Sequence, residues 1–69
     1  MDDEGLKIIH EALDTQLRNE DFERAVGRTV RRRNLEFKKY VEVVGELREL
    51  ALAESVTPED AARKLLSRS

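Results

Sequence analysis

The sequence predicts a small all-α domain, and three observations support this fold class. Apolar residues return every three or four positions along most of the chain, which is the spacing of one face of an α-helix. Residues that favour helices dominate the composition, and Pro58 is the only proline. The β-branched residues also follow helical spacing and do not alternate as they would in a strand. We therefore expect a three-helix domain, with helices over about 6–18, 20–54 and 58–67.

Length and composition limit what this domain can be. A chain of 69 residues forms one domain at most, so we take 1–69 as a single helical domain with a marginal core. Charged residues make up 41% of it, but the regular spacing of its apolar residues is not that of a disordered chain. It has no cysteine and no apolar segment that could span a bilayer. We therefore expect a cytoplasmic protein that does not contact a membrane.

The first expected helix follows an acidic lead-in, residues 1–5, which we expect to fray. Ile8 points away from the apolar face of this helix, so we interpret it as an ordinary exposed side chain. We interpret Asn19 as the N-cap of the next helix. The apolar face itself consists of Leu6, Ile9, Leu13 and Leu17.

The central segment, 20–54, carries the longest helical pattern. One continuous helix of this length would span roughly 50 Å at about 1.5 Å per residue, which exceeds the width of a compact domain of this size. Asn34 follows three arginines and favours a helix end near 32–35, whereas the apolar stripe keeps its phase across that run. Two alternatives stay open: a single bent helix, or a split that gives four helices. Gly45 suggests close approach of another helix, or a tolerated weak point.

The clearest local signal precedes the last helix. Thr57 suits an N-cap, and Pro58 suits the first helical position, where its missing N–H costs nothing. The stretch from Leu47 to Leu66 resembles a helix-turn-helix, with a short turn and a capped second helix. The turn glycine typical of that motif is absent, and two acidic residues open the second helix. We therefore favour an αα-hairpin that closes the core.

Charge is segregated along the chain although the net charge is only −2. Residues 1–23 carry eight acidic and two basic residues, and residues 24–39 carry seven basic and one acidic residue. The acidic first helix can pair with the basic block, which is the interpretation that we favour. The alternatives are that the basic stripe binds nucleic-acid phosphate or an acidic protein surface. The candidate anion-binding residues on this stripe are Arg24, Arg28, Arg31 and Arg32.

Two features weigh against nucleic-acid binding. The pI is about 5.4, and the aromatic residues Phe22, Phe37 and Tyr40 follow the apolar stripe, which would leave no aromatic platform for bases. Nucleic acid is therefore the less favoured partner.

No pattern in the sequence is typical of a catalytic or cofactor site. His10 and Asp14 have the spacing of two metal ligands on one helical face, but the sequence indicates no third ligand. The three glycines are isolated, so there is no Gly-rich phosphate loop, and no nucleophile is paired with a histidine. We therefore expect no enzyme, no metal, no cofactor and no small-molecule substrate.

The apolar stripe of the central segment is wider than two short helices can cover. Some of it should stay exposed in a monomer and bind a second copy of the chain or another helical protein. We therefore expect a non-catalytic protein–protein interaction or regulatory module that self-associates. The alternative is a small helix-turn-helix-like DNA-binding regulator that uses the 24–39 basic stripe. The expected partner-binding residues are Phe37, Tyr40, Val41, Val44, Gly45, Leu47 and Leu50.

Overall fold

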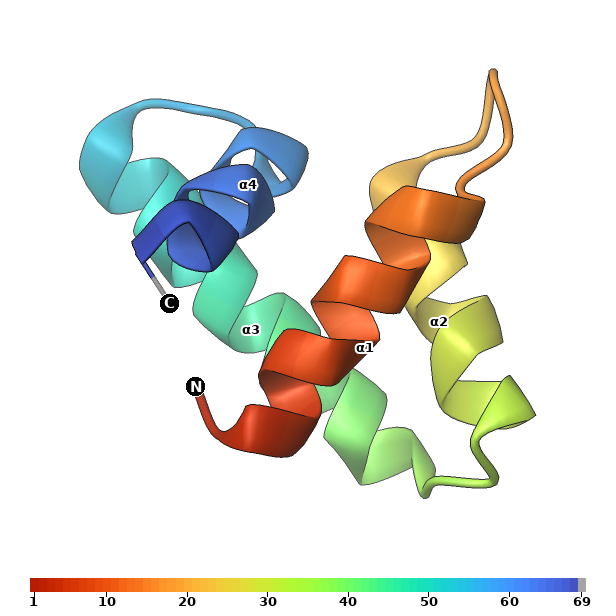
Figure 1. Ribbon diagram of the computed structural model, residues 1–69. Helices are drawn as coiled ribbons and strands as arrows, with labels where there is room; N and C mark the ends of the chain where they lie inside the picture. Colours follow the sequence, from red (N-terminus) through yellow and green to blue (C-terminus); the bar gives the residue numbers. More distant parts are fainter. Residues whose placement is uncertain (69) are drawn as a thin grey trace.

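Two helical hairpins make up the computed structural model, which describes residues 1–68 (Figure 1). α1 packs most extensively on α2, and α3 packs most extensively on α4. The described residues contain helices and turns but no strand, which confirms the all-α prediction. The four helices are α1 (Asp3–Thr15), α2 (Phe22–Arg32), α3 (Phe37–Glu54) and α4 (Pro58–Arg68).

The central segment is split into α2 and α3, so the four-helix alternative is correct. Asn34 lies between the two helices with a φ of 56°, in the left-handed region that asparagine tolerates better than most residues. Its N–H donates to the carbonyl of Arg31 at 3.0 Å, and the N–H of Leu35 donates to the carbonyl of Val30 at 3.0 Å. This pair of hydrogen bonds is a Schellman motif, which ends a helix. The domain is only 31 Å along its longest axis, in keeping with the length argument against one continuous helix.

The N-terminal residues belong to α1, so the prediction that residues 1–5 fray is wrong. The Oδ1 atom of Asp2 accepts a hydrogen bond from the N–H of Gly5 at 2.7 Å and caps the helix. The side chain of Met1 lies directly over Gly5, where even a Cβ would be only 2.4 Å from the Met1 Cγ. These two contacts order the first turn.

The buried face of α1 also differs from the prediction. Ile8 was expected to be exposed, but it is completely buried. Because α1 packs against both α2 and α4, its buried face is wider than the predicted stripe of leucine and isoleucine residues. Leu17 was expected in the core but is 66% exposed, because α1 ends at Thr15. Arg28 of α2 donates a hydrogen bond to the carbonyl of Thr15 at 2.9 Å, which occupies an acceptor that the next helical turn would have used.

The loop between α1 and α2 is held by Glu20, and α2 begins two residues later than expected. Asp21 occupies the N-cap position of α2, so the assignment of Asn19 to that position is wrong. The Glu20 carboxylate accepts hydrogen bonds from the N–H of Leu17 and from the Arg28 guanidinium. Both hydrogen bonds hold the pKa of the Glu20 carboxyl below its usual value. The loop is thus fixed by a side chain rather than by an early helical turn.

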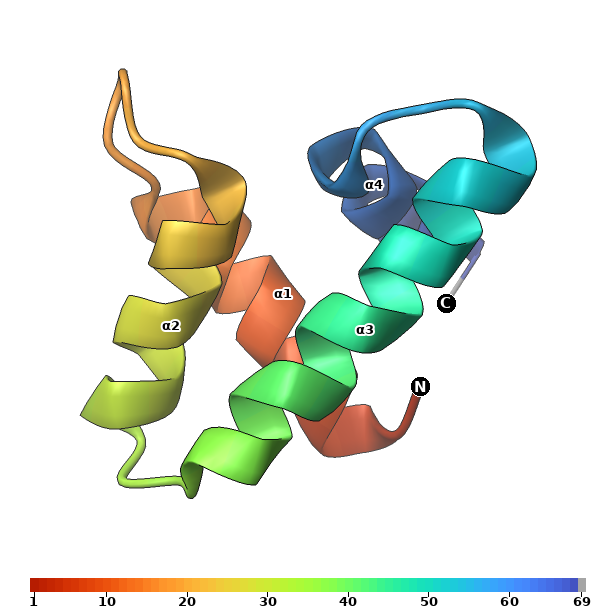
Figure 2. The same cartoon turned by 180° about the vertical axis from the view of Figure 1, so that it is seen from behind.

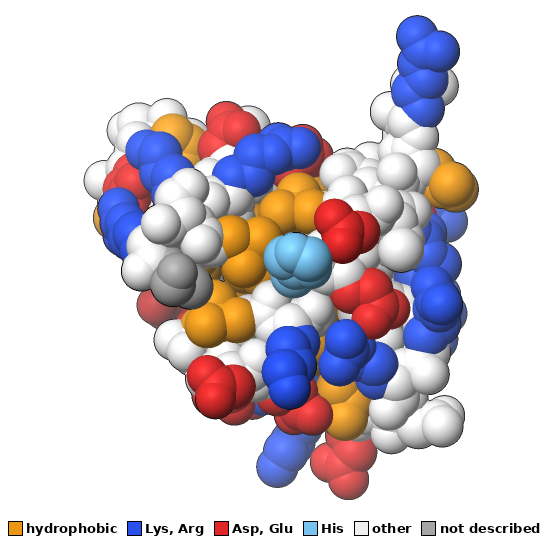
Figure 3. Space-filling view, viewed as in Figure 1, with side chains coloured by type: hydrophobic (Ala, Val, Ile, Leu, Met, Phe, Trp, Pro, Cys, Tyr) orange, Lys and Arg blue, Asp and Glu red, His pale blue; other side chains and the backbone are white. Residues whose placement is uncertain are grey.

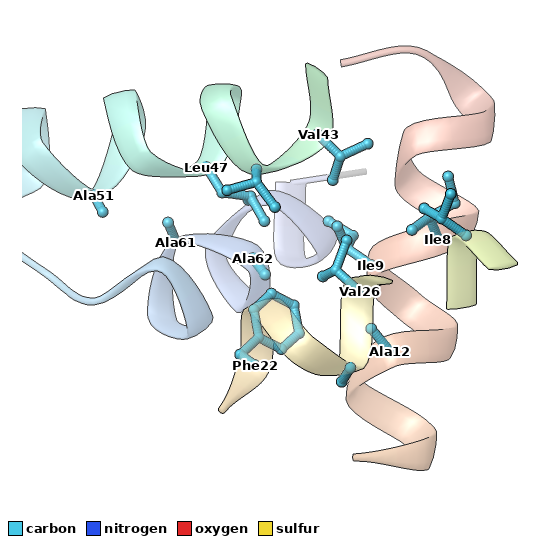
Figure 4. Packing of buried hydrophobic residues seen from close by; sticks show 13 residues of the cluster. Ile8, Ile9, Ala12, Phe22, Val26, Val43, Leu47, Ala51, Ala61 and Ala62 are labelled. Atoms are coloured by element: carbon cyan, nitrogen blue, oxygen red, sulfur yellow. The ribbon is translucent and has the colours of Figure 1, made fainter. Parts of the chain in front are cut away.

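All four helices contribute to the core (Figure 4). Phe22 of α2 lies near Ala62 of α4 and Leu47 of α3 in the middle of the packed residues. Alanines at the contact between α3 and α4 let the two helices approach closely. The one buried polar residue of the described chain, Thr29, donates its hydroxyl hydrogen to the carbonyl of Ala25 at 2.9 Å. Within residues 1–68 no buried side-chain nitrogen or oxygen lacks a hydrogen-bond partner.

The turn between α3 and α4 combines a predicted cap with a strained residue. The Oγ1 atom of Thr57 accepts a hydrogen bond from the N–H of Asp60 at 3.1 Å, which confirms Thr57 as the N-cap of α4. Ser55 ends α3 with a φ of 56°, and the N–H of Val56 donates to the carbonyl of Ala51 at 3.0 Å. This is again a Schellman arrangement, but here a serine occupies the left-handed position that glycine usually takes.

We predict that Thr57→Ala lowers the free energy of unfolding by about 1 kcal/mol, because one N–H of the first turn of α4 loses its acceptor. In a domain of this size this corresponds to several degrees of melting temperature. Circular dichroism melts would measure the change, with Thr57→Ser as the control that keeps the hydroxyl. Equal melting temperatures for all three proteins would show that the cap contributes nothing.

We predict that Ser55→Gly raises the free energy of unfolding by about 0.5–1 kcal/mol, because glycine adopts a positive φ without the steric cost of a Cβ. Ala53→Gly, at an exposed position inside α3, serves as the control and should lower it by a similar amount. Urea denaturation would measure both. A loss of stability in both variants would contradict the assignment of strain to Ser55.

Candidate functional site

An open groove with a volume of about 710 Å³ lies between α2 and the start of α3. Figure 2 shows the two helices joined by the short turn that contains Asn34. The groove brings together residues from both sets that the sequence singled out, the arginines of the basic stripe and the aromatic residues of the apolar stripe. It is lined by Glu23, Arg24, Gly27, Val30, Arg31, Leu35, Phe37 and Tyr40.

The floor of the groove is apolar and depends on Gly27. A Cβ atom at this position would lie 3.3 Å from Cε1 of Tyr40, so the tyrosine ring rests directly on the bare backbone of α2. The rings of Tyr40 and Phe37 are stacked, with their centroids 5.4 Å apart and their planes inclined by 27°. The sequence analysis did not single out Gly27. A glycine inside a helical pattern is the signal that could have found it.

Phe37 is 73% exposed, although the sequence analysis placed it in the core stripe. It is the first residue of α3, and the split of the central segment removes the helical turn that would have covered it. The expectation that no aromatic ring is available at the surface is therefore wrong. An aromatic side chain lies open at the edge of the groove.

Two arginines that form no salt bridge within the described chain line the groove. Arg24 and Arg31 are seven residues apart, which places them on one face of α2 at a separation of roughly 10.5 Å along the helix. Both are exposed, and neither makes a salt bridge or a side-chain hydrogen bond within residues 1–68. The acid that lines the groove, Glu23, is bound by Arg48 of α3 through hydrogen bonds of 2.6 and 2.8 Å. The groove therefore has a net positive charge.

The other arginines of the predicted basic stripe pair within the chain. Arg28 binds Glu20, and Arg32 lies 3.9 Å from Glu11 of α1. The neighbouring Arg33 also binds Glu11, at 2.9 Å. The acidic N-terminal block thus pairs with the basic block, as the favoured interpretation of the charge pattern has it. This leaves Arg24 and Arg31 of the four candidates free to bind an anion.

The predicted apolar site on α3 divides between the core and the surface. Leu47 is completely buried and Val44 is 6% exposed, so both belong to the core and not to a partner surface. Tyr40 and Leu50 are half-buried against the core. The split adds a helix that can cover this stripe, because α2 packs on α3 in addition to α4.

The residues of α3 that stay open form a surface of their own, the exposed α3 face. At 100° per residue they lie within about 80° of one another. Figure 2 shows α3 in front, with no other helix over this side. A Cβ atom at Gly45 would meet nothing within 4 Å, so no helix of the chain approaches it closely. The exposed α3 face consists of Phe37, Val41, Gly45, Arg48 and Leu52.

Leu52 was absent from the predicted site, yet it is 81% exposed and the most exposed of the large hydrophobic residues on this face. Val41 is 53% exposed. Arg48 lies between them, and its charge is offset by Glu23. The spacing of Val41 and Leu52, eleven residues apart, is the helical signal that could have grouped them.

His10 lies on the opposite side of the molecule, where Figure 3 shows the histidine at the surface. Its Nδ1 atom is 3.3 Å from an oxygen of Asp14, and both side chains are 66% exposed. Within the described chain no group of three or more potential metal ligands converges. None of the helices in that part of the chain is long and apolar enough to cross a membrane.

Comparisons with protein families, with curated proteins and with solved structures gave no match to this chain. Any functional conclusion therefore depends on the two surfaces, the groove and the exposed α3 face.

We predict that Glu23→Gln lowers the melting temperature at pH 7 and that this difference shrinks in acid. Arg48 holds the pKa of the Glu23 carboxyl below its ordinary value of 4.5, because it donates hydrogen bonds to the ionised form. The stabilisation is complete above about pH 4.5 and is lost as the pH falls through the lowered pKa. Melting curves between pH 7 and pH 3 would measure it. Asp3→Asn, at an exposed acid of α1 without an ion pair and outside the exposed α3 face, is the control and should change the melting temperature less.

Proposed function

We propose that this protein is a non-catalytic protein–protein interaction module that forms a homodimer through the exposed α3 face. The observation that carries the proposal is the row of open apolar side chains on α3. Phe37, Val41 and Leu52 are between 53% and 81% exposed, and together they extend over almost the whole length of the helix. Large apolar side chains that are left exposed along one face of a helix are a common feature of interfaces.

The exposed α3 face suits a second copy because it is self-complementary. In an antiparallel pair of helices that crosses at Gly45, the bare backbone lets the two helices approach closely. Lys38 and Glu49 flank the face on the same side, are exposed, and make no ion pair within residues 1–68. Two-fold symmetry brings Lys38 of one copy next to Glu49 of the other, and the reverse. Opposite charges then meet twice across the interface.

The module needs no cofactor, metal ion or small-molecule substrate for this role, and we expect it to act in the cytoplasm, since a chain without cysteine suits a reducing compartment. A regulatory role would follow if dimer formation controls access to other surfaces. Another helical protein could occupy the same face, and the mass of the protein in solution distinguishes the two cases.

A helix-turn-helix-like DNA-binding regulator is the second candidate function. The observation in its favour is that the open ring of Phe37, which could stack on a base, lines the same groove as Arg31. Against it, Arg28 and Arg32 are engaged by acids, and Glu59 and Asp60 open the helix that would enter the major groove. Two free arginines supply little of the phosphate contact on which DNA affinity depends.

We predict that the wild-type protein runs at twice the mass of one chain in sedimentation equilibrium, and that Leu52→Glu runs at the mass of one chain. The substitution places a carboxylate in the interface, whereas the side chain is already 81% exposed in the monomer, so folding should be retained. Dilution should lower the melting temperature of the wild type alone.

Leu17→Glu is the matched control. This leucine is also exposed, at 66%, but it lies in the loop between α1 and α2, away from the exposed α3 face. It should leave the dimer intact. A wild-type mass of one chain across a hundredfold concentration range would refute the homodimer and leave only a heterologous helical partner.

A further inference from the structure

We infer that the groove between α2 and α3 binds an acidic, amphipathic helical segment of another protein. This site shares Phe37 with the exposed α3 face but is otherwise formed by different residues, and it adds a second type of partner to the dimer. The groove supplies both things that such a segment needs, an apolar floor and a cationic rim.

The shape and polarity of the floor favour a large apolar side chain as the anchor of the ligand. Four of the lining residues are large and apolar: the stacked rings of Tyr40 and Phe37, and Val30 and Leu35, which are joined by a hydrogen bond of the Schellman motif that ends α2. The volume of about 710 Å³ is open to solvent and accommodates one or two side chains of the size of leucine or phenylalanine. No other segment of the described chain occupies it.

The positive charges of two arginines in the groove indicate that acidic residues flank the apolar anchor of the ligand. Arg24 and Arg31 are two helical turns apart, project from one face of α2, and make no salt bridge or side-chain hydrogen bond within residues 1–68. The other three arginines of this region are all engaged by acids. The one acid in the groove, Glu23, is neutralised by Arg48. A ligand helix with two carboxylates about seven residues apart would therefore match both arginines at once.

A helical peptide fits these observations better than a nucleic acid. Nucleic-acid binding would require several phosphate contacts, and the groove offers two cations over an apolar floor. A peptide helix satisfies its own backbone hydrogen bonds and can bury an apolar side chain between its two acidic ones. The remaining acidic surface of the protein would repel a long polyanion but not a short segment.

A selection from a displayed library of random 16-residue peptides tests this inference without assuming a sequence. We expect the enriched peptides to share two acidic residues about seven positions apart with large apolar residues between them. A labelled synthetic peptide of that sequence should bind saturably in fluorescence anisotropy. Arg24→Glu combined with Arg31→Glu should weaken its binding at least about tenfold.

Lys7→Glu combined with Arg18→Glu is the matched control, because it makes the same charge change at two exposed, unpaired residues outside the groove. Binding to this variant should stay within twofold of wild type. No enrichment, enriched peptides without acidic residues, equal loss of binding in both double variants, or tighter binding of a single-stranded or duplex oligonucleotide would each overturn the inference.

The outcome can be separated from that of the proposed homodimer. The peptide should bind Leu52→Glu at least as tightly as wild type, because this variant keeps every residue of the groove lining and leaves Phe37, which the two surfaces share, uncovered. A wild-type protein that is monomeric but binds the peptide would refute the dimer alone. A dimer that selects no acidic peptide would refute the groove inference alone.

Discussion

The reversal of the chain at Asn34 is the constraint on which the rest of this structure depends. Without it, α2 and α3 would continue as one rod, and the apolar residues of the two helices could not face one another across a common core. The left-handed conformation costs little at an asparagine, and the Schellman hydrogen bonds compensate the carbonyls at the end of α2. The same reversal creates the groove, because it holds the start of α3 beside α2 and leaves Phe37 uncovered. Fold and candidate site thus have one origin.

Ion pairs between helices help to determine how the four helices of this domain are arranged. Glu11 of α1 binds Arg33, the residue that follows α2 in the chain. Glu23 of α2 binds Arg48 of α3, and Glu54 of α3 binds Lys64 of α4. Each exposed pair adds only about 0–1 kcal/mol, but together they disfavour other arrangements of four similar helices. Since most basic residues are committed in this way, the few that remain unpaired, and especially the two at the groove, carry more functional information than the total charge does.

Signals that depend only on neighbouring residues could be predicted from the sequence. The Thr57 cap and the start of α4 at Pro58 follow from local backbone chemistry, and the structure has both. Local chemistry also indicated an interruption near Asn34, but it left a bend and a split as alternatives. Signals that depend on distant residues could not. α1 ends at Thr15 because Arg28 of another helix reaches its carbonyl, and this contact decides that Leu17 is exposed.

The candidate site was predictable to a similar degree. Helical spacing placed Phe37, Val41 and Gly45 on α3, and their exposure agrees with a role at a surface. It could not exclude Val44 and Leu47, because their burial depends on how many helices surround α3. The groove combines residues from two helices, so only the tertiary arrangement shows that Arg24 and Arg31 line the same groove as two aromatic rings.

Because Gly27 contacts the Tyr40 ring, the size of the residue at position 27 determines the width of the groove. An alanine there would meet the tyrosine ring at 3.3 Å and displace it by a few tenths of an ångström, and a larger residue would displace it farther. Because the ring is rigid, a methyl group added on α2 shifts a side chain that α3 contributes to the groove. Related proteins could therefore differ in the size of the side chain that they accept through this single position, while their cores and their cationic rims stay the same.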